Sequence, residues 1–146
     1  MDAANDIASY FLPQGKTIVS ETFGNSGQKE ETFRSTGHSL LNGNRFKMAI
    51  LVDSGSASAS EIVAAALADH EVATIIGEKT FGKGSVQELI QLPGDTALKV
   101  TVAKWVTPNG NIIDKEGVTP DLTIEDDKET QEDEVLLRAL EFLGEL

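Results

Sequence analysis

The sequence contains no cysteine, so disulfide bonds, thiol catalysis and thiolate metal sites are all excluded. Basic residues are also scarce: 12 lysines and arginines stand against 24 aspartates and glutamates, and the formal net charge is −12. A protein that binds nucleic acid or an anionic membrane surface needs a basic patch to displace counterions. We therefore predict no nucleic-acid partner.

Other features are missing as well. No apolar run approaches membrane-spanning length, and the acidic N-terminus, Met1 to Ile7, lacks the basic and apolar regions of a signal peptide. The two histidines form no ligand-spaced cluster, which argues against a zinc site, and we predict no bound metal. His38 falls in a polar loop and His70 at a predicted helix C-terminus, so we expect neither to serve in a Ser-His-Asp triad.

The chain is long enough, at 146 residues with 40% apolar composition, to form one domain with its own core. Apolar positions recur at helical spacing over residues 2–12, and Pro13 ends this helix. Short β-branched segments at 16–22 and 31–35 predict a pair of strands. The continuous apolar run Met48 to Val52 is typical of a strand that is buried on both faces of a parallel sheet.

A strand–helix–strand unit is predicted at the centre of the chain, with a helix over 58–70 and a second strand over 73–76. From residue 85 to residue 106 the pattern changes to period two, which predicts antiparallel or mixed strand pairing in the second half and not a doubly wound sheet. We therefore predict a single α/β domain over residues 1–146, in which 126–146 form an acidic linker and a C-terminal helix. Thr130 and Asp133 match a weak capping box before that helix.

A run of small residues joins the apolar strand to the central helix, and it contains serines at 54, 56, 58 and 60. Each of them is an ordinary candidate for a helix N-cap. A serine at this junction also lies among free backbone N–H groups and at the positive end of the helix dipole, which suits an oxyanion. The junction therefore favours a nucleophile.

A lysine follows the second strand of the unit. A serine becomes a nucleophile when a base removes its proton, and a neutral lysine is one such base. Burial lowers the pKa of lysines in general, and Lys83 lies between Gly82 and Gly84, where the backbone can press close to a neighbour. These glycines therefore allow Lys83 to be buried, a point that the sequence alone does not decide. Gln87 lies on the same face as Lys83 if the intervening segment is extended, and its amide oxygen can accept a hydrogen bond from the lysine.

Two motifs carry a family resemblance. Gly55-Ser-Ala-Ser-Ala-Ser-Glu-Ile and Gly77-Glu-Lys-Thr-Phe-Gly-Lys-Gly-Ser-Val-Gln resemble the signature of the carboxyl-terminal processing (tail-specific) proteases, the S41 serine peptidases. The segments Ala8 to Lys16 and Gly117 to Asp121 also resemble flanking segments of that family. The resemblance thus covers essentially the whole chain.

The resemblance implies a Ser-Lys dyad on a crotonase/ClpP-like α/β core with a mixed β-sheet. Carried over residue by residue, it makes Ser58 the nucleophile, Lys83 the general base and Gln87 the assisting residue. It also makes the backbone N–H of Ala59 the first oxyanion donor. No cofactor is implied.

The family usually has an Asp-Leu-Arg-x-Asn-Pro-Gly-Gly segment before the first helix, whose glycine turn is expected to supply the second oxyanion donor, and a PDZ domain. Neither is present in this sequence, so we expect a core that is truncated at its N-terminus. Members of the family cleave partly unfolded proteins with apolar C-terminal tails, usually outside the cytoplasm, in the periplasm or cell envelope. A homo-oligomer is also an expectation for this chain.

Other readings of the same residues remain. The fragment is alternatively an inactive α/β core that folds or oligomerises without hydrolysing peptides. Residues 77–83 fit the first seven positions of a phosphate-binding loop, but Gly84 stands where that motif needs Ser or Thr. The Gly-x-Ser-x-Gly pattern of a nucleophile elbow fails around Ser58. Phe81 and Trp105 are predicted to pack in the core, although Phe81 is also a candidate to line a substrate pocket.

Overall fold

The computed structural model describes residues 2–24, 29–38, 46–125 and 132–145. Its helices and strands follow one another along the chain in the order α1 (Asp2–Phe11), β1 (Thr17–Thr22), β2 (Glu31–Arg34), β3 (Ala49–Val52), α2 (Ala59–Asp69), β4 (Thr74–Gly77), β5 (Ser85–Leu92), β6 (Thr96–Val106), β7 (Leu122–Thr123) and α3 (Glu134–Leu143).

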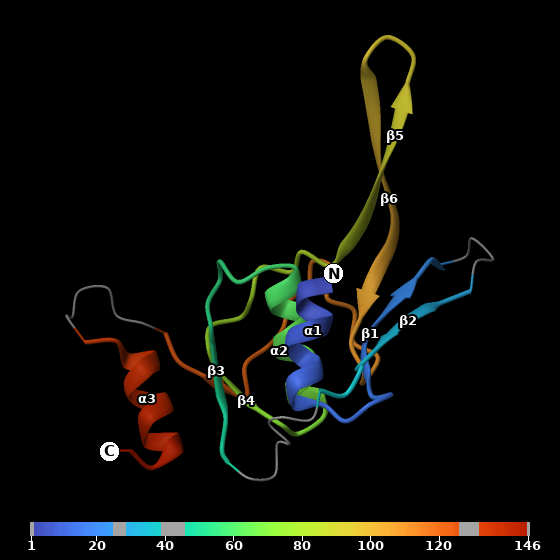
Figure 1. Cartoon of the computed structure of the whole chain (residues 1–146). Coiled ribbons are helices and arrows are strands. Elements are labelled where there is room, and N and C mark those ends of the chain that lie inside the picture. Colours follow the sequence, from blue (N-terminus) through green and yellow to red (C-terminus); the bar gives the residue numbers. More distant parts are fainter. Residues whose placement is uncertain (1, 25–28, 39–45, 126–131, 146) are drawn as a thin grey trace.

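The strands form two sheets with the helices α1 and α2 between them (Figure 1). One sheet is antiparallel with the strand order β2-β1-β6-β5, and the other is parallel with the order β3-β4-β7. Helix α3 lies on the far side of β3 and β4 (Figure 1). The predicted α/β fold with a C-terminal helix is therefore confirmed, and the parallel and antiparallel strands occupy separate sheets.

The main core lies where α1 and α2 pack against each other and against β1. Small side chains on both helices let their backbones approach closely, and large side chains from the sheet fill the space beside them. Trp105 is buried, as predicted, and its ring meets Phe33 edge-on at 5.8 Å between ring centroids. Each fully buried large apolar side chain contributes about 1.5–3 kcal/mol by leaving water. The fully or nearly fully buried apolar residues of this core are Ala4, Ala8, Leu12, Ile18, Val19, Ile62, Ala66, Leu67, Trp105 and Ile113.

Strand β3 corrects one prediction. It pairs in parallel with β4, as expected, but Leu51 is 45% exposed. Ile50 and Val52 pack towards the core, whereas Leu51 lies on the opposite face of the sheet. Because β3 is an edge strand and α3 covers only part of that outer face, the continuous apolar run is not buried on both sides.

Helix α3 begins after the acidic stretch. Asp133 is its N-cap and accepts a hydrogen bond from the backbone N–H of Leu136 at 2.8 Å, which satisfies one of the free donors of the first turn. Gly144 ends the helix with φ of 85°, a left-handed conformation that suits glycine. The predicted partner in the capping box, Thr130, and the linker residues 126–131 lie outside the described residues. No helix within the described ranges is long and apolar enough to cross a membrane.

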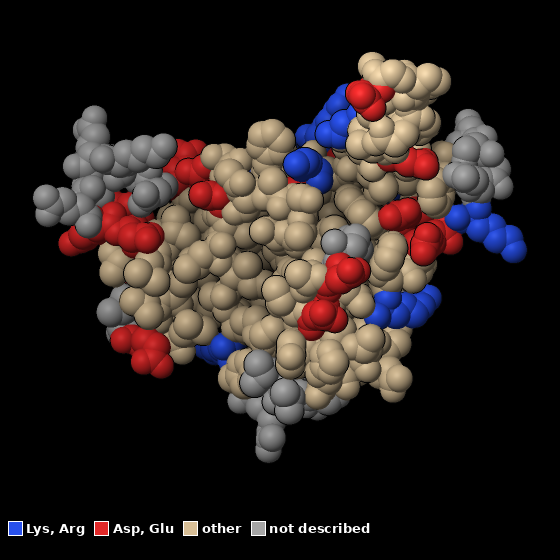
Figure 2. Space-filling model, turned by 45° about the horizontal axis from the view of Figure 1, so that its top comes forward, with Lys and Arg blue, Asp and Glu red and all other residues tan. Residues whose placement is uncertain are grey.

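Strands β5 and β6 form a long hairpin that projects from the body of the molecule (Figure 1). The hairpin comes towards the viewer at the upper right of Figure 2, where most of its visible atoms belong to uncharged residues. Because other elements contact only its base, its outer part exposes large apolar side chains on both faces. These are Leu89, Ile90, Leu92 and Leu98.

Candidate active site

The site begins with a tight turn at the end of β3. The backbone N–H of Ser56 donates to the carbonyl of Asp53 at 3.1 Å, and the Asp53 carboxylate accepts the Ser56 hydroxyl at 2.8 Å. The same carboxylate accepts the backbone N–H of Gly55 at 3.1 Å. These hydrogen bonds, with that from the Ser56 hydroxyl the strongest cause, hold the pKa of Asp53 below its usual value. The turn is thus tied to its own first residue.

Ser58 follows the turn and is the N-cap of α2, with φ of 57° and ψ of −116°. A positive φ is uncommon for a residue with a Cβ and costs on the order of 1–3 kcal/mol unless the surroundings enforce it. A sharp, strained turn from strand to helix is the backbone geometry of a nucleophile elbow. The elbow therefore forms here although its sequence pattern is absent, and strained residues of this kind cluster at active sites.

The backbone N–H groups at the start of α2 differ in their partners. The N–H of Ser58 donates to the Glu61 carboxylate at 2.8 Å, and that of Ser60 donates to the carbonyl of Ala57 at 3.2 Å. Within the described part of the chain, the N–H of Ala59 has no hydrogen-bond acceptor. Ala59 is exposed, so this N–H is available to a ligand beside Ser58.

Lys83 lies on the loop between β4 and β5, flanked by two buried glycines. A Cβ on Gly84 would stand 2.2 Å from the backbone nitrogen of Asp114, and a Cβ on Gly82 would stand 3.0 Å from that of Gly117. The predicted close approach of the backbone is therefore confirmed. The burial of Lys83 that these glycines would allow is not observed, because the loop presses its backbone inwards and leaves this side chain exposed.

Glu61 is a site residue that the sequence reasoning missed. Its side chain is fully buried at 0% exposure, and its carboxylate accepts four hydrogen bonds. Oε1 accepts from the Thr80 hydroxyl at 2.5 Å and from the N–H of Gly82 at 2.6 Å. Oε2 accepts from the N–H of Ser58 at 2.8 Å and from the N–H of Lys83 at 2.9 Å. The capping-box spacing from Ser58 to Glu61 was the signal in the sequence that could have pointed to it.

Sharing one carboxylate oxygen brings Ser58 and Lys83 together. Because both backbone nitrogens lie within hydrogen-bonding distance of Oε2, they are less than about 6 Å apart. No hydrogen bond joins the Ser58 hydroxyl to the Lys83 amine in the described ranges. Gln87 is exposed near the start of β5, opposite Thr101, and its catalytic role stays a prediction, as do those of Ser58, Lys83 and Ala59.

Phe81 lies beside the turn, because its backbone N–H donates to the carbonyl of Ser56 at 3.0 Å. Its side chain is 66% exposed, so the prediction that it packs in the core is wrong. A hollow of about 280 Å³ opens on the β3 side of the same turn, and Leu51 and Val135 are among the residues that line it. Apolar side chains therefore border the candidate site on the described surface.

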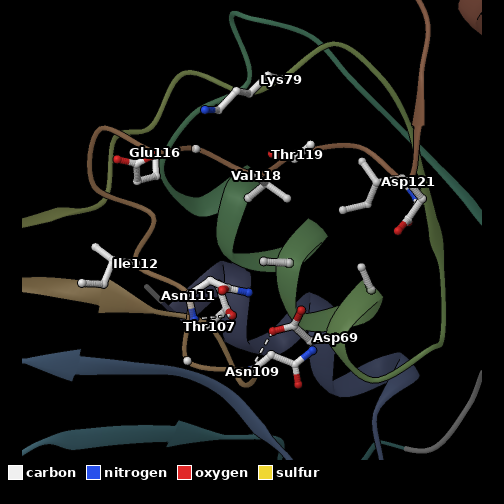
Figure 3. Close-up of a pocket in the computed structure, with 15 residues that line it drawn as sticks. Asp69, Lys79, Thr107, Asn109, Asn111, Ile112, Glu116, Val118, Thr119 and Asp121 are labelled. Atoms are coloured by element: carbon white, nitrogen blue, oxygen red, sulfur yellow. Dashed lines mark hydrogen bonds between the residues drawn. The ribbon is translucent and has the colours of Figure 1, made fainter.

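A larger cavity than this hollow lies elsewhere in the described part of the molecule. It has a volume of about 740 Å³, and neither Ser58 nor Lys83 lines it (Figure 3). Asp69 accepts the backbone N–H of Asn109 within it, and Asp121 accepts the backbone N–H of Ile75. The first hydrogen bond holds the loop at Asn109 and the second holds β4 at Ile75. Because neither Ser58 nor Lys83 lines the cavity, it is separate from the candidate active site.

The profile of peptidase family S41 matches residues 1–124. The chain belongs to peptidase family S41. Over 128 residues this S41 chain is 39% identical to a protein named "Probable CtpA-like serine protease" from Staphylococcus aureus (strain N315), covering 88% of this chain and 25% of that protein. A protein of the same name from Staphylococcus epidermidis is 36% identical over 124 residues, covering 85% of this chain and 25% of its own length.

Solved structures agree with this membership. The photosystem II D1 C-terminal processing protease superposes with a TM-score of 0.76 at 34% identity, over 85% of this chain and 31% of its own. A putative peptidase from Parabacteroides merdae superposes with a TM-score of 0.77, over 96% of this chain and 46% of its own, at 16% identity, and shows the fold alone. The S41 chain spans about a quarter of the length of the curated relatives that it matches.

Proposed function

We propose that this S41 chain carries the catalytic core of a C-terminal processing endopeptidase, with Ser58 and Lys83 as its dyad. The single observation that carries the proposal is the shared oxygen of Glu61, which holds the backbones of both residues in one corner of the molecule. The strained φ of Ser58 supports the proposal, since an elbow presents a serine hydroxyl outwards at the start of a helix.

The reaction proceeds through an acyl-enzyme. The neutral amine of Lys83 takes the proton of the Ser58 hydroxyl while Oγ attacks the carbonyl carbon of the scissile peptide bond. The carbonyl oxygen becomes an oxyanion, to which the N–H of Ala59 donates. The C–N bond then breaks, and Lys83 returns the proton to the leaving amine. In the second half, Lys83 takes a proton from a water molecule that attacks the ester carbonyl carbon, the bond from that carbon to Oγ breaks, and Lys83 returns the proton to Oγ, which releases the carboxylic acid product.

Lys83 must lose its water to act as a base, because desolvation favours the neutral amine. In this structure the side chain is exposed, so we propose that the bound polypeptide covers it and completes the desolvation. Gln87 then orients the amine through its amide oxygen without adding a negative charge that would hold the proton.

The proposed substrates are partly unfolded proteins with apolar C-terminal tails. Phe81 and Leu51 are 66% and 45% exposed, and each borders the elbow turn or the hollow beside it. Apolar side chains of an extended tail would leave water by packing there. By family resemblance we propose that this takes place outside the cytoplasm and that the protein assembles as a homo-oligomer.

A second candidate is an inactive core. Two observations favour it: Lys83 is exposed, and no side-chain hydrogen bond joins it to Ser58 in the described ranges. In that case the chain folds as an S41 core and hydrolyses nothing.

Cleavage of an unfolded polypeptide with an apolar C-terminal tail, with fragments identified by mass, separates the two candidates. Ser58→Ala and Lys83→Ala are expected to lower the rate by about 10³-fold or more. Ser60→Ala and Lys79→Ala are the matched controls, because each lies within four residues of its counterpart, and both should retain activity. A parent chain that is folded but inert supports the inactive core, and cleavage that survives Ser58→Ala refutes the dyad.

A further inference from the structure

Glu61 takes no part in the chemical steps of the proposed reaction. Among the described residues, however, it is the acidic residue whose side chain is fully buried. Burying a carboxylate is costly unless its oxygens are hydrogen-bonded. Here two oxygens accept four donors at 2.5–2.9 Å, which offsets that cost. The positions of these four donors in the fold indicate what the buried carboxylate of Glu61 does.

The donors come from more than one element. A helix-capping role accounts for the hydrogen bond from Ser58, which precedes α2. The other three donors, from Thr80, Gly82 and Lys83, all lie on the loop between β4 and β5. The Thr80 hydroxyl in turn accepts the backbone N–H of Val118 at 2.7 Å, which extends the network to the segment after β6. Capping therefore explains one contact in four.

We infer that Glu61 is a positioning residue for hydrolysis, which fixes the backbone of Ser58 relative to that of Lys83. This inference rests on the proposed dyad. One oxygen spans the two N–H groups, so any movement of the lysine loop away from the elbow lengthens a charge-assisted hydrogen bond. The same bond holds Ser58 at φ of 57°, a conformation that a serine does not keep without outside support.

The carboxylate is chemically suited to this role in a way that an amide is not. A glutamine at position 61 keeps one oxygen acceptor and replaces the other by an NH₂ donor. In one orientation the NH₂ group faces the N–H groups of Ser58 and Lys83, and in the other it faces the N–H of Gly82 and the Thr80 hydroxyl. Glu61→Gln thus preserves size and shape but opens one half of the network.

Glu61→Gln is compared with Glu78→Gln, a matched control because Glu78 lies on the same loop and its side chain makes none of these hydrogen bonds. Amide hydrogen exchange is followed at Ser58, Gly82 and Lys83. The amide of Asp121, which donates to the carbonyl of Ile75, serves as a remote reference. Cleavage of the tail-bearing polypeptide is measured on the same samples, with kcat and KM determined separately.

For Glu61→Gln we expect exchange at least about tenfold faster at one or more of the three site amides and unchanged at Asp121. We expect kcat to fall by about 10²-fold with KM within about threefold, because the dyad is misplaced and not removed. Exchange that stays slow at all three amides, or that rises equally at Asp121, refutes the positioning role. So does a normal kcat with an opened network.

Thr80→Val keeps the inference testable if Glu61→Gln does not fold. It removes one donor to Oε1 and the acceptor of the Val118 N–H, and it leaves the Oε2 pair in place. Exchange should therefore rise at Val118 and remain slow at Ser58 and Lys83. Uniform loss of protection would overturn the inference. If the parent chain cleaves nothing, the proposed function fails, whereas the exchange data still decide whether Glu61 holds the elbow and the loop together.

Discussion

Residues 53–61 and 78–84 form one corner of the molecule, and the β5–β6 hairpin begins directly after it, at Ser85. The two regions are stabilised by different kinds of contact. The corner combines a strained serine, glycines pressed against backbone and a buried carboxylate with donors from two segments. The hairpin is a regular antiparallel ladder with one bulge, and its outer part exposes apolar side chains on both faces. The structure of the corner therefore depends on contacts between distant parts of the chain, whereas that of the hairpin depends on the pairing of its own two strands.

This difference teaches where substitutions should matter. In the corner, Glu61 and Gly84 contact groups that are far apart from them in sequence, so a single change at either position removes more than one interaction. In the hairpin, each residue interacts mainly with its cross-strand neighbour, and such pairs contribute only about 0.2–1 kcal/mol each. The following predictions test that contrast.

The largest effect is expected from Gly84→Ala. Its Cβ would stand 2.2 Å from the backbone nitrogen of Asp114, which cannot move aside like a flexible side chain. We expect the free energy of unfolding to fall by about 3 kcal/mol or more, measured by urea denaturation. Gly94→Ala in the hairpin turn is the matched control. It has φ of 80° but open space around it, and should cost about 1 kcal/mol. Equal losses at the two sites would contradict the comparison.

A smaller effect is expected in the sheet from which the hairpin extends. Glu21 and Glu31 are direct partners on β1 and β2, and burial together with the Glu31 charge raises the pKa of Glu21. A raised pKa means that the native state holds this proton more tightly, so the contribution to stability is present at low pH and is lost as pH rises through the raised value. Glu31→Gln should therefore stabilise the fold by about 0.2–1 kcal/mol near neutral pH.

The measurement is thermal unfolding of both proteins across pH. The advantage of Glu31→Gln should shrink below about pH 4, where carboxyl groups are protonated. An advantage that is constant with pH would show that the two carboxylates do not interact. Glu30→Gln is the neighbouring control, because Glu30 precedes β2 and is not paired with Glu21.

The smallest effect is expected at Asp53, which is exposed at the surface of the corner. Hydrogen bonds from Ser56 and Gly55 lower its pKa, so its contribution to stability is present above its unfolded value and is lost as pH falls through the lowered value. Asp53→Asn should therefore destabilise the protein slightly at neutral pH and not below about pH 3. A difference that grows on acidification would have the wrong sign, and equilibrium unfolding at the two pH values decides.

Much of the fold could be predicted because it follows from local patterns. Four predicted segments correspond to observed elements: the helix over residues 2–12, the strands at 16–22 and 31–35, and the period-two stretch after residue 85. The exposed Leu51 was not predictable, because an apolar run does not reveal that its strand lies at a sheet edge. The exposure of Lys83 was not predictable for a related reason: close approach at the flanking glycines concerns the backbone and says nothing of where the side chain points.

By itself, the sequence determined the elements, the family signature and the junction at which a serine meets a helix N-terminus, because periodicity and turn chemistry act between near neighbours. Only the tertiary structure decided that Ser58 and Lys83, 25 positions apart, share one oxygen of Glu61. That meeting depends on the βαβ unit placing the end of β3 beside the loop after β4, and on the backbone of residues 113–117 packing against Gly82 and Gly84. Contacts of this kind depend on packing between segments that are distant in the chain.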